Sequence, residues 1–336
     1  MRKLLLIATG GTIASDQGTT GLTPMLDAGA LLTHVPKISE MYHVDAVQPV
    51  NLDSTNMRPC DWLTIASSIR KYYSAYDGFV VAHGTDTMAY TAAALSYLIQ
   101  LSPKPIVLTG AQKSIVTEDT DARINLYDAF AYAADPGSHG VSIVFDGRVI
   151  TGTRARKVRT KSRNAFESVD FPNLAMVRDG RIFRYIPMAR PEGPFFSDAI
   201  DASVASVKLT PGLGANVLTA LRMSLNALVV ESFGVGGVPN SDGGRLVDEI
   251  KKWREENKIV AVTTQVPYEG SDMGVYEVGR RVLDECGVLE SYTMTPECAV
   301  VKLMWILGKT REYDEIKRLF YTPVANDLLV HTGYYE

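Results

Sequence analysis

The stretch KLLLIATGGTIASD, residues 3–16, runs directly from an apolar segment into Thr9-Gly10-Gly11-Thr12. Apolar residues without polar alternation are typical of a strand that is buried on both faces of a sheet. A glycine pair after such a strand serves one of two purposes. Its backbone N–H groups bind a phosphate, or its sharp turn presents a side chain as a nucleophile.

Three further apolar segments in the first half of the chain are each followed by a polar or glycine-containing turn. A helical pattern, MAYTAAALSYLIQ at residues 88–100, comes shortly after the first of them. Alternation of strands and helices predicts an α/β fold with a doubly wound parallel sheet. The three segments are GFVVA (78–82), PIVLT (105–109) and VSIVF (141–145).

A second series of the same kind follows a break in the pattern. Residues 184–203 carry prolines, glycine and charge without periodicity, which is typical of a connection between domains. We therefore predict an N-terminal domain at 1–188, a linker at 189–203 and a C-terminal α/β domain at 204–336. The second series comprises VASVKLT (204–210), ALVVESFGVGG (227–237), RLVDEIKKWREEN (245–257) and KIVAVTTQ (258–265).

Composition excludes several classes of protein. The 336 residues are 46% hydrophobic and 21% charged with a net charge of −4, so neither nucleic acid nor an anionic membrane is an expected partner. The three cysteines form no CxxC pair, which fits a reducing compartment, and the five histidines form no HExxH, so no metal is expected. The first apolar run is too short for a signal peptide and no run could span a membrane. We expect a cytoplasmic protein.

Ligands of parallel sheets bind beyond the carboxyl ends of the strands. Thr12, His83, Thr85, Asp86 and Gln112 all follow apolar strands, so we expect them on one edge of the site. TGGTIASDQG contains neither GxGxxG nor a Walker lysine, which disfavours phosphate. Residues 15–30 are polar and glycine-rich and predict a mobile loop.

The turn TGGT alone is more often structural than catalytic. The second motif, HGTDT at 83–87, adds a hydroxyl and a carboxylate to the same edge and favours the nucleophile, although Asp86 or Thr87 could instead cap the following helix. A threonine needs a base. His83 precedes the glycine that turns the chain, so we expect it to be structural.

A lysine serves as a base when burial or neighbouring cations lower its pKa. RARKVRTKSR, residues 154–163, crowds cations together, although by composition alone it is more typical of a solvent-exposed basic face or an RNA-binding patch.

These motifs resemble those of a known family. TGGTIA (9–14) and VAHGTDTMAY (81–90) resemble the paired signatures of bacterial-type L-asparaginases, and the resemblance extends over essentially the whole chain, nearest to the cytoplasmic type I branch. It implies two α/β domains, the larger N-terminal, with the active site between them. It also implies hydrolysis of L-asparagine to L-aspartate and ammonia through an acyl-enzyme, minor glutaminase activity and no cofactor. Further matching segments are NLDSTNM (51–57), VLTGAQ (107–112), FDGRVITGTRARKVRTKS (145–162), ESFGVGGVP and YEVGRRV.

The resemblance also implies roles for individual residues. Thr12 matches the nucleophile, and Thr85, Asp86 and Lys161 match a second cluster in which Lys161 tunes proton transfer and Thr85 handles the attacking water. Asp86 would also bind the α-ammonium of the substrate. The remaining substrate-binding residues are Ser54 and Thr55 for the α-carboxylate, and Gly11 and Gly84 beside the amides that stabilise the oxyanion.

Glu297 resembles an acidic residue that a neighbouring subunit lends to the site, which implies a homodimer or homotetramer. The alternative is that Thr295 caps a helix, Pro296 is its first residue, and the helix dipole alone favours a glutamate there.

One feature of the sequence departs from the family. Many relatives have a tyrosine in the loop after the nucleophile, whereas residues 15–30 contain none and Leu22 stands at that place.

Two other functions fit the same core. An amidase subunit of a tRNA-dependent amidotransferase would be expected to carry an additional N-terminal domain, whereas TGGTIA begins at residue 9. A non-catalytic amino-acid sensor would be expected to lack catalytic residues, whereas Thr12, Thr85, Asp86 and Lys161 are all present. The sequence therefore favours the asparaginase.

Overall fold

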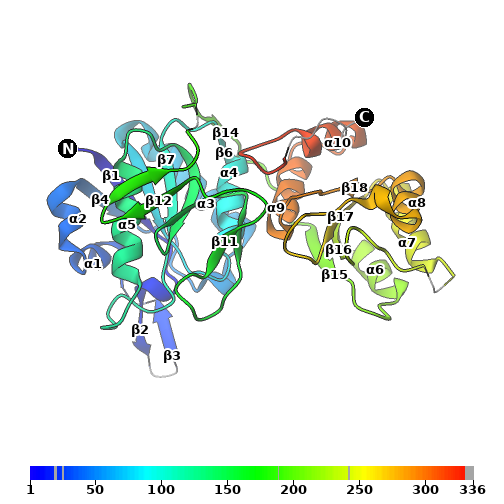
Figure 1. The fold of residues 1–336 in the computed structure, drawn as a ribbon, viewed down its shortest axis with the longest axis horizontal. Coiled ribbons are helices and arrows are strands. Elements are labelled where there is room, and N and C mark those ends of the chain that lie inside the picture. Colours follow the sequence, from blue (N-terminus) through cyan, green and yellow to red (C-terminus); the bar gives the residue numbers. More distant parts are fainter. Residues whose placement is uncertain (19–20, 25, 188, 241–242, 330–336) are drawn as a thin grey trace. The chain divides into compact units, whose positions relative to one another are not determined.

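The computed structural model describes residues 1–18, 21–24, 26–187, 189–240 and 243–329. The chain divides into two compact units, Met1–Asp198 and Ala199–Glu336 (Figure 1). The division falls inside the segment predicted to be a linker. Each unit is built around a parallel sheet of its own, as the two series of apolar segments predict.

The first unit contains an eight-stranded sheet in the order β13-β12-β9-β8-β7-β5-β1-β4. Five of its strands are parallel, because each returns to the sheet after a crossover. Four of these five match predicted strands, and β4 is additional. The five are β1 (Lys3–Ala8), β4 (His43–Val47), β5 (Gly78–Ala82), β7 (Pro105–Thr109) and β8 (Gly140–Phe145).

An antiparallel extension, which the sequence patterns did not predict, completes this sheet. Strand β9 (Arg148–Thr151) pairs with β8 and with β12 (Ala175–Arg178), which pairs with β13 (Arg181–Arg184). Both hairpins turn at an Asp-Gly pair, with Asp146 at φ 50° and Asp179 at φ 51°. Such left-handed Asp-Gly turns match the twist of antiparallel strands.

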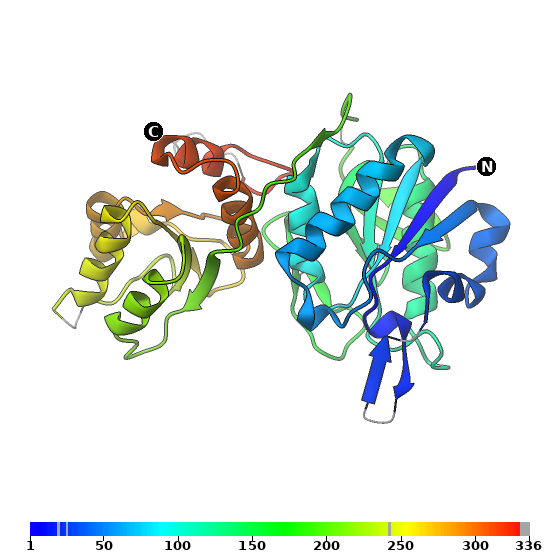
Figure 2. The ribbon, with the colours of Figure 1, turned by 180° about the vertical axis from the view of Figure 1, so that it is seen from behind.

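Helices cover both faces of the sheet. Helix α5 (Ala122–Ala134) lies on one face and α3 (Pro59–Tyr72) and α4 (Met88–Leu98) on the other (Figures 1 and 2). Leu4 and Leu6 of β1 join the core under α5, and the alternate residues of the same strand are equally buried. The strand is therefore buried on both faces, as predicted. Short helices α1 (Ala28–Thr33) and α2 (Pro36–Met41) extend the α5 layer.

The prediction of a loop over residues 15–30 was wrong in part. Strands β2 (Ser15–Gly18) and β3 (Gly21–Pro24) pair in antiparallel fashion, and α1 follows them along the chain. The Leu22 side chain lies outside what the structure describes. Two small pairs, β10 (Ala155–Lys157) with β11 (Phe166–Ser168) and β6 (Ile99–Gln100) with β14 (Phe195–Phe196), complete the unit, together with three 3₁₀ turns, Thr12–Ala14, Ser54–Asn56 and Tyr73–Ala75.

The second unit has a four-stranded parallel sheet in the order β15-β16-β17-β18. Trp253 and Val282 contribute to its core from two helices that pack on it. None of the helices in the described part of the chain is long and apolar enough to cross a membrane. The elements are β15 (Val204–Lys208), α6 (Ala215–Arg222), β16 (Ala227–Ser232), α7 (Arg245–Glu255), β17 (Ile259–Thr264), the 3₁₀ turn Met273–Val275, α8 (Glu277–Cys286), β18 (Leu289–Glu290), α9 (Pro296–Leu307) and α10 (Tyr313–Tyr321).

Candidate active site

The turn after β1 brings Thr12 to the carboxyl edge of the sheet. The Gly11 N–H donates to the Leu52 carbonyl at 3.0 Å, which fixes the turn. Gly10 and Gly11 have φ values of 93° and 76°, a left-handed conformation that side chains with a Cβ rarely adopt. Thr12 then opens a 3₁₀ turn and is half-buried. The glycine pair therefore serves a sharp turn that ends at a hydroxyl.

The two threonine motifs touch through their glycines. A Cβ added to Gly11 would collide with the backbone N and Cα of Gly84, and one added to Gly84 would lie 2.5 Å from the Ser54 Oγ. The turns after β1 and β5 and the segment at Ser54 therefore meet with no side chain between the two glycines. Thr12 directly follows Gly11, and Thr85 directly follows Gly84. The contact between the glycines therefore places both threonines at the same edge of the sheet.

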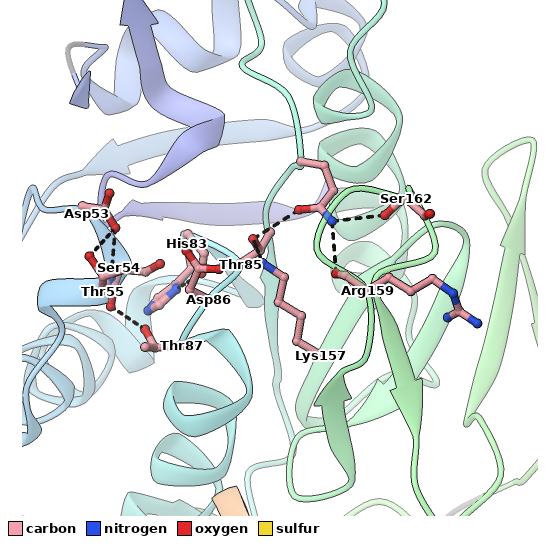
Figure 3. Close-up of polar contacts among 12 residues, drawn as sticks. Asp53, Ser54, Thr55, His83, Thr85, Asp86, Thr87, Lys157, Arg159 and Ser162 are labelled. Carbon is pink, nitrogen blue, oxygen red and sulfur yellow. Dashed lines mark hydrogen bonds and ion pairs between the residues drawn. The ribbon is translucent and has the colours of Figure 1, made fainter. Parts of the chain in front are cut away.

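Lys157, and not Lys161, is the lysine of this site. The Lys157 Nζ donates to the Thr85 Oγ1 at 2.8 Å and pairs with the Asp86 Oδ1 at 2.7 Å (Figure 3). The Thr85 residue is buried and the Lys157 side chain is only 16% exposed. The prediction that Lys161 joins this cluster was wrong.

The local fold explains the correction. Lys157 is the last residue of β10, which pairs with β11 and thereby directs the side chain toward Thr85. Lys161 follows in the loop between these two strands and is exposed. Both lysines belong to one cationic run, so residue type alone did not separate them.

Gln112 connects Thr85 to the loop beyond Lys157. Its Nε2 donates to the carbonyls of Arg159, at 3.4 Å, and Ser162, at 3.1 Å, which orients the Oε1 toward the Thr85 hydroxyl at 3.4 Å. The buried Asp121 holds the Gln112 backbone, because its Oδ2 accepts from the Gln112 N–H at 2.9 Å. Thr85 thus accepts from Lys157 and donates to Gln112.

Ser54 and Thr55 have different surroundings. Ser54 is buried beside Gly84, and its carbonyl accepts from the Thr87 hydroxyl at 2.8 Å. Thr55 is exposed, and its hydroxyl donates to the Asp53 Oδ1 at 2.9 Å. Thr87 occupies the N-cap position of α4 without a capping hydrogen bond from its side chain. Capping therefore does not account for HGTDT.

His83 is structural, as predicted. Its ring is fully buried, with the Nδ1 donating to the Gly84 carbonyl at 2.7 Å and the Nε2 accepting from the Thr91 hydroxyl at 2.9 Å. We assign this tautomer because a carbonyl oxygen can only accept. Burial lowers the pKa of His83 to about 4, so the ring is neutral at pH 7. Its ring therefore supports the Gly84 turn and the start of α4.

Glu297 belongs to the second unit, in the first turn of α9. The Thr295 hydroxyl caps this helix by accepting from the Cys298 N–H at 3.1 Å, and Pro296 is the first helical residue. The structural role considered for this glutamate therefore has the expected local geometry. A role in the active site of a neighbouring subunit stays a prediction.

Two family models match most of the chain. The N-terminal asparaginase family model matches residues 3–189, and the glutaminase/asparaginase C-terminal domain model matches residues 203–320. The chain belongs to the asparaginase family. The type I resemblance agrees with a solved relative, the L-asparaginase I of Vibrio cholerae, which is 29% identical with a TM-score of 0.86 and covers 98% of this chain and 99% of its own.

Other relatives of this asparaginase-family chain cover it almost completely. The L-asparaginase of Thermococcus kodakarensis is 38% identical over 97% of this chain and 99% of its own length, and a solved structure of the thermostable enzyme has a TM-score of 0.92, covering 98% of this chain and 100% of its own. A glutamyl-tRNA(Gln) amidotransferase component from Pyrococcus furiosus is 36% identical, covering 98% of this chain and 77% of its own length.

Proposed function

We propose that this asparaginase-family chain hydrolyses L-asparagine to L-aspartate and ammonia. The contact between Gly11 and Gly84 carries the proposal, because it brings a threonine at a sharp turn to the edge that holds Thr85 and Lys157. A hydroxyl beside a second hydroxyl and a lysine suits nucleophilic attack on an amide. Relatives named L-asparaginase at 36–38% identity support the same reaction.

In this proposal Thr12 attacks the side-chain amide carbon of asparagine. The carbon–nitrogen bond breaks, the Thr12 hydroxyl proton passes to the leaving nitrogen, and ammonia departs. The acyl group then remains on Thr12 as a β-aspartyl ester. Water then attacks the ester, aspartate leaves and the proton returns to Thr12. The Thr85–Lys157–Asp86 cluster holds and transfers the protons, since Lys157 contacts both partners. Lys161 has no step in this scheme.

The binding of the substrate's charged groups follows from the same residues. Lys157 contacts only the Oδ1 of Asp86, so the Oδ2 can accept a hydrogen bond from an α-ammonium. The Asp86 side chain is 56% exposed and is therefore accessible to a substrate. Ser54 lies beside Gly84 at a position suited to the α-carboxylate. The Gly11 N–H already donates to Leu52, so the amides of Thr12 and Gly84 are the better donors to the oxyanion.

The subunit arrangement and location belong to the same proposal. We place the enzyme in the cytoplasm as a homodimer or homotetramer in which Glu297 approaches a neighbouring site. A solved relative from Campylobacter jejuni, 27% identical with a TM-score of 0.82, is named a probable cytoplasmic L-asparaginase, which supports the location.

Ammonia release by the purified chain tests the reaction. We expect saturable release from L-asparagine, weaker release from L-glutamine and none from Thr12→Ala. Because one methylene separates the substrates, the preference between them should stay within about 10–200-fold. Unchanged release by Thr12→Ala would remove Thr12 from the reaction.

A second candidate is a component of a tRNA-dependent amidotransferase. Relatives named as glutamyl-tRNA(Gln) amidotransferase components align over nearly the whole chain at 33–36% identity. This role predicts that the chain alone releases little ammonia from either amide and that a partner protein with glutamyl-tRNA(Gln) stimulates release from glutamine. Full activity of the isolated chain on asparagine would decide against it.

A further inference from the structure

An open pocket of about 620 Å³ lies on the α5 layer of the first unit. Two hairpin turns, at Asp146-Gly147 and Asp179-Gly180, border it together with one face of α5. The helix contributes Ile124 and Asp128 among others, at the spacing of three or four residues that places side chains on one face. No residue proposed above for catalysis or for substrate binding lines this pocket.

Asp128 is a buried carboxylate that faces the pocket without a partner. The residue is only 6% exposed, yet among the residues that the structure describes, no hydrogen bond or ion pair reaches its side chain. Asp121, about two turns earlier at the N-cap of the same helix, instead accepts from the N–H groups of Gln112 and Lys113. The Asp128 oxygens are not among the fully buried atoms that lack a partner, so they reach the open pocket and can accept hydrogen bonds from a ligand there.

The surroundings of Asp128 are negative. Burial and the Asp179 carboxylate raise the pKa of Asp128 to about 7. The cations that line the pocket are held elsewhere: Arg163 pairs with Asp119, Arg123 donates to the Ile115 carbonyl, and Lys37 lies over the Tyr127 ring. None of the three neutralises the carboxylate.

The shape and chemistry of the pocket select one class of ligand. Asp121 and Asp146 also line the pocket, but no group of three histidines, cysteines or acids suited to a metal occurs in the described part of the chain. A divalent cation needs several oxygen ligands gathered around one point. An ammonium group instead carries three hydrogen-bond donors. Val35, Ile124 and Val177 line the same pocket and offer apolar contact to an alkyl chain.

We propose that this pocket binds a primary alkylammonium ligand, with the ammonium between Asp128 and Asp179 and the alkyl chain against Val35, Ile124 and Val177. The site is separate from the one in which Asp86 would receive the α-ammonium of the substrate, and it does not depend on the hydrolytic activity.

Titration of the full chain with n-butylammonium chloride, followed by ligand NMR at constant ionic strength, tests the site. We expect saturable binding in the millimolar range and no comparable binding of 1-butanol, which has the same chain without the charge. Asp128→Asn should weaken binding about tenfold or more, since an amide keeps the shape but not the charge. Asp198→Asn, a change of an exposed carboxylate outside the pocket, is the matched control and should leave binding unchanged. Asp86→Asn shows whether the ammonium enters the proposed active site instead.

Three results would overturn the proposal: no saturable binding to the wild type, equal binding of 1-butanol, or binding that Asp86→Asn removes and Asp128→Asn does not. Asp179→Asn is the second variant if Asp128→Asn does not fold, and it should weaken binding several-fold. Circular dichroism of each variant confirms that it is folded before the titration.

Discussion

Lys157 and Lys161 lie four residues apart in one cationic run, and their contacts separate them. Lys157 donates to Thr85 and pairs with Asp86, whereas Lys161 is exposed in the following loop. We expect Lys157→Met to lower kcat about 10²–10⁴-fold, because the variant loses the group that holds the proton network. Lys161→Met, the matched control, should stay within about twofold of the wild type, as surface substitutions usually do.

Steady-state ammonia release by the two variants is the measurement. Equal losses in both would mean that the cationic run acts through its overall charge. A loss confined to Lys161→Met would restore the assignment that the sequence alone suggested.

His83 makes the stability of the fold depend on pH. The pKa of His83 is about 4 in the folded chain, below the ordinary value of 6.5 that applies to the unfolded chain. The unfolded chain therefore takes up the proton first as the pH falls. Stability is therefore full above pH 6.5 and is lost as the pH falls toward 4, by about 3 kcal/mol in total. His83→Asn keeps a donor near the Nδ1 position and should lose this dependence.

The difference in free energy of unfolding between wild type and His83→Asn, measured across that range of pH, isolates this histidine. Asp128, whose raised pKa has the opposite effect on stability, contributes equally to both proteins and cancels. Parallel curves for the two proteins would contradict the assignment of His83 as a buried neutral ring.

At the scale of elements, α9 is tied to the segment after α10 by a buried ion pair. The Lys302 Nζ lies 2.6 Å from the Asp327 Oδ2 and donates to the Thr322 carbonyl at 3.0 Å, and both charged side chains are fully buried. Lys302→Met leaves the Asp327 charge without its partner and should destabilise the second unit by about 3–5 kcal/mol. Chemical unfolding followed by tryptophan fluorescence reports mainly on this unit, which contains Trp253 and Trp305, and Trp62→Phe as the background removes the signal of the first unit.

The double variant Lys302→Met with Asp327→Asn is the control for this prediction. Asparagine keeps an oxygen that can accept from the Val324 N–H, as the Asp327 Oδ1 does at 2.8 Å, and removes the stranded charge. It should recover part of the lost stability. A double variant less stable than Lys302→Met would show that the pair contributes through packing rather than charge.

The whole-molecule question is whether Glu297 acts on another subunit. We expect Glu297→Gln to raise KM with a loss of about 0.3–1 kcal/mol in stability, the amount a helix dipole accounts for. Refolding this variant together with Thr12→Ala should then restore activity, because a mixed oligomer can combine an intact Thr12 with an intact Glu297.

Thr12→Ala refolded with Lys157→Met provides the contrast. Thr12 and Lys157 belong to the same compact unit, so exchanging subunits should not restore a site that needs both. Absence of recovery with Glu297→Gln as well would confine that glutamate to its helix, where Thr295 and Pro296 already form the start of α9.

Several strands that build the site, and the residues that follow them, were predictable from local sequence patterns. Buried parallel strands carry an unbroken apolar signal, and β1, β5 and β7 were predictable because of it. The glycine pair was equally readable, since Gly10 and Gly11 adopt backbone angles that other residues avoid. The prediction of His83 as a structural residue also rested on local order along the chain.

Tertiary contacts were needed to identify the lysine that meets Thr85 and to show that Gln112, already expected at this edge, lies within hydrogen-bond distance of it. These contacts join residues 27 and 72 positions apart, and they depend on strand pairing and loop direction, which residue type does not encode locally. The antiparallel strands β9, β12 and β13 were missed because short mixed segments lack the continuous apolar signal. The surroundings of Asp128 could not be predicted from local sequence either. This residue becomes buried beside a pocket only because two hairpin turns that are distant in the sequence lie next to α5.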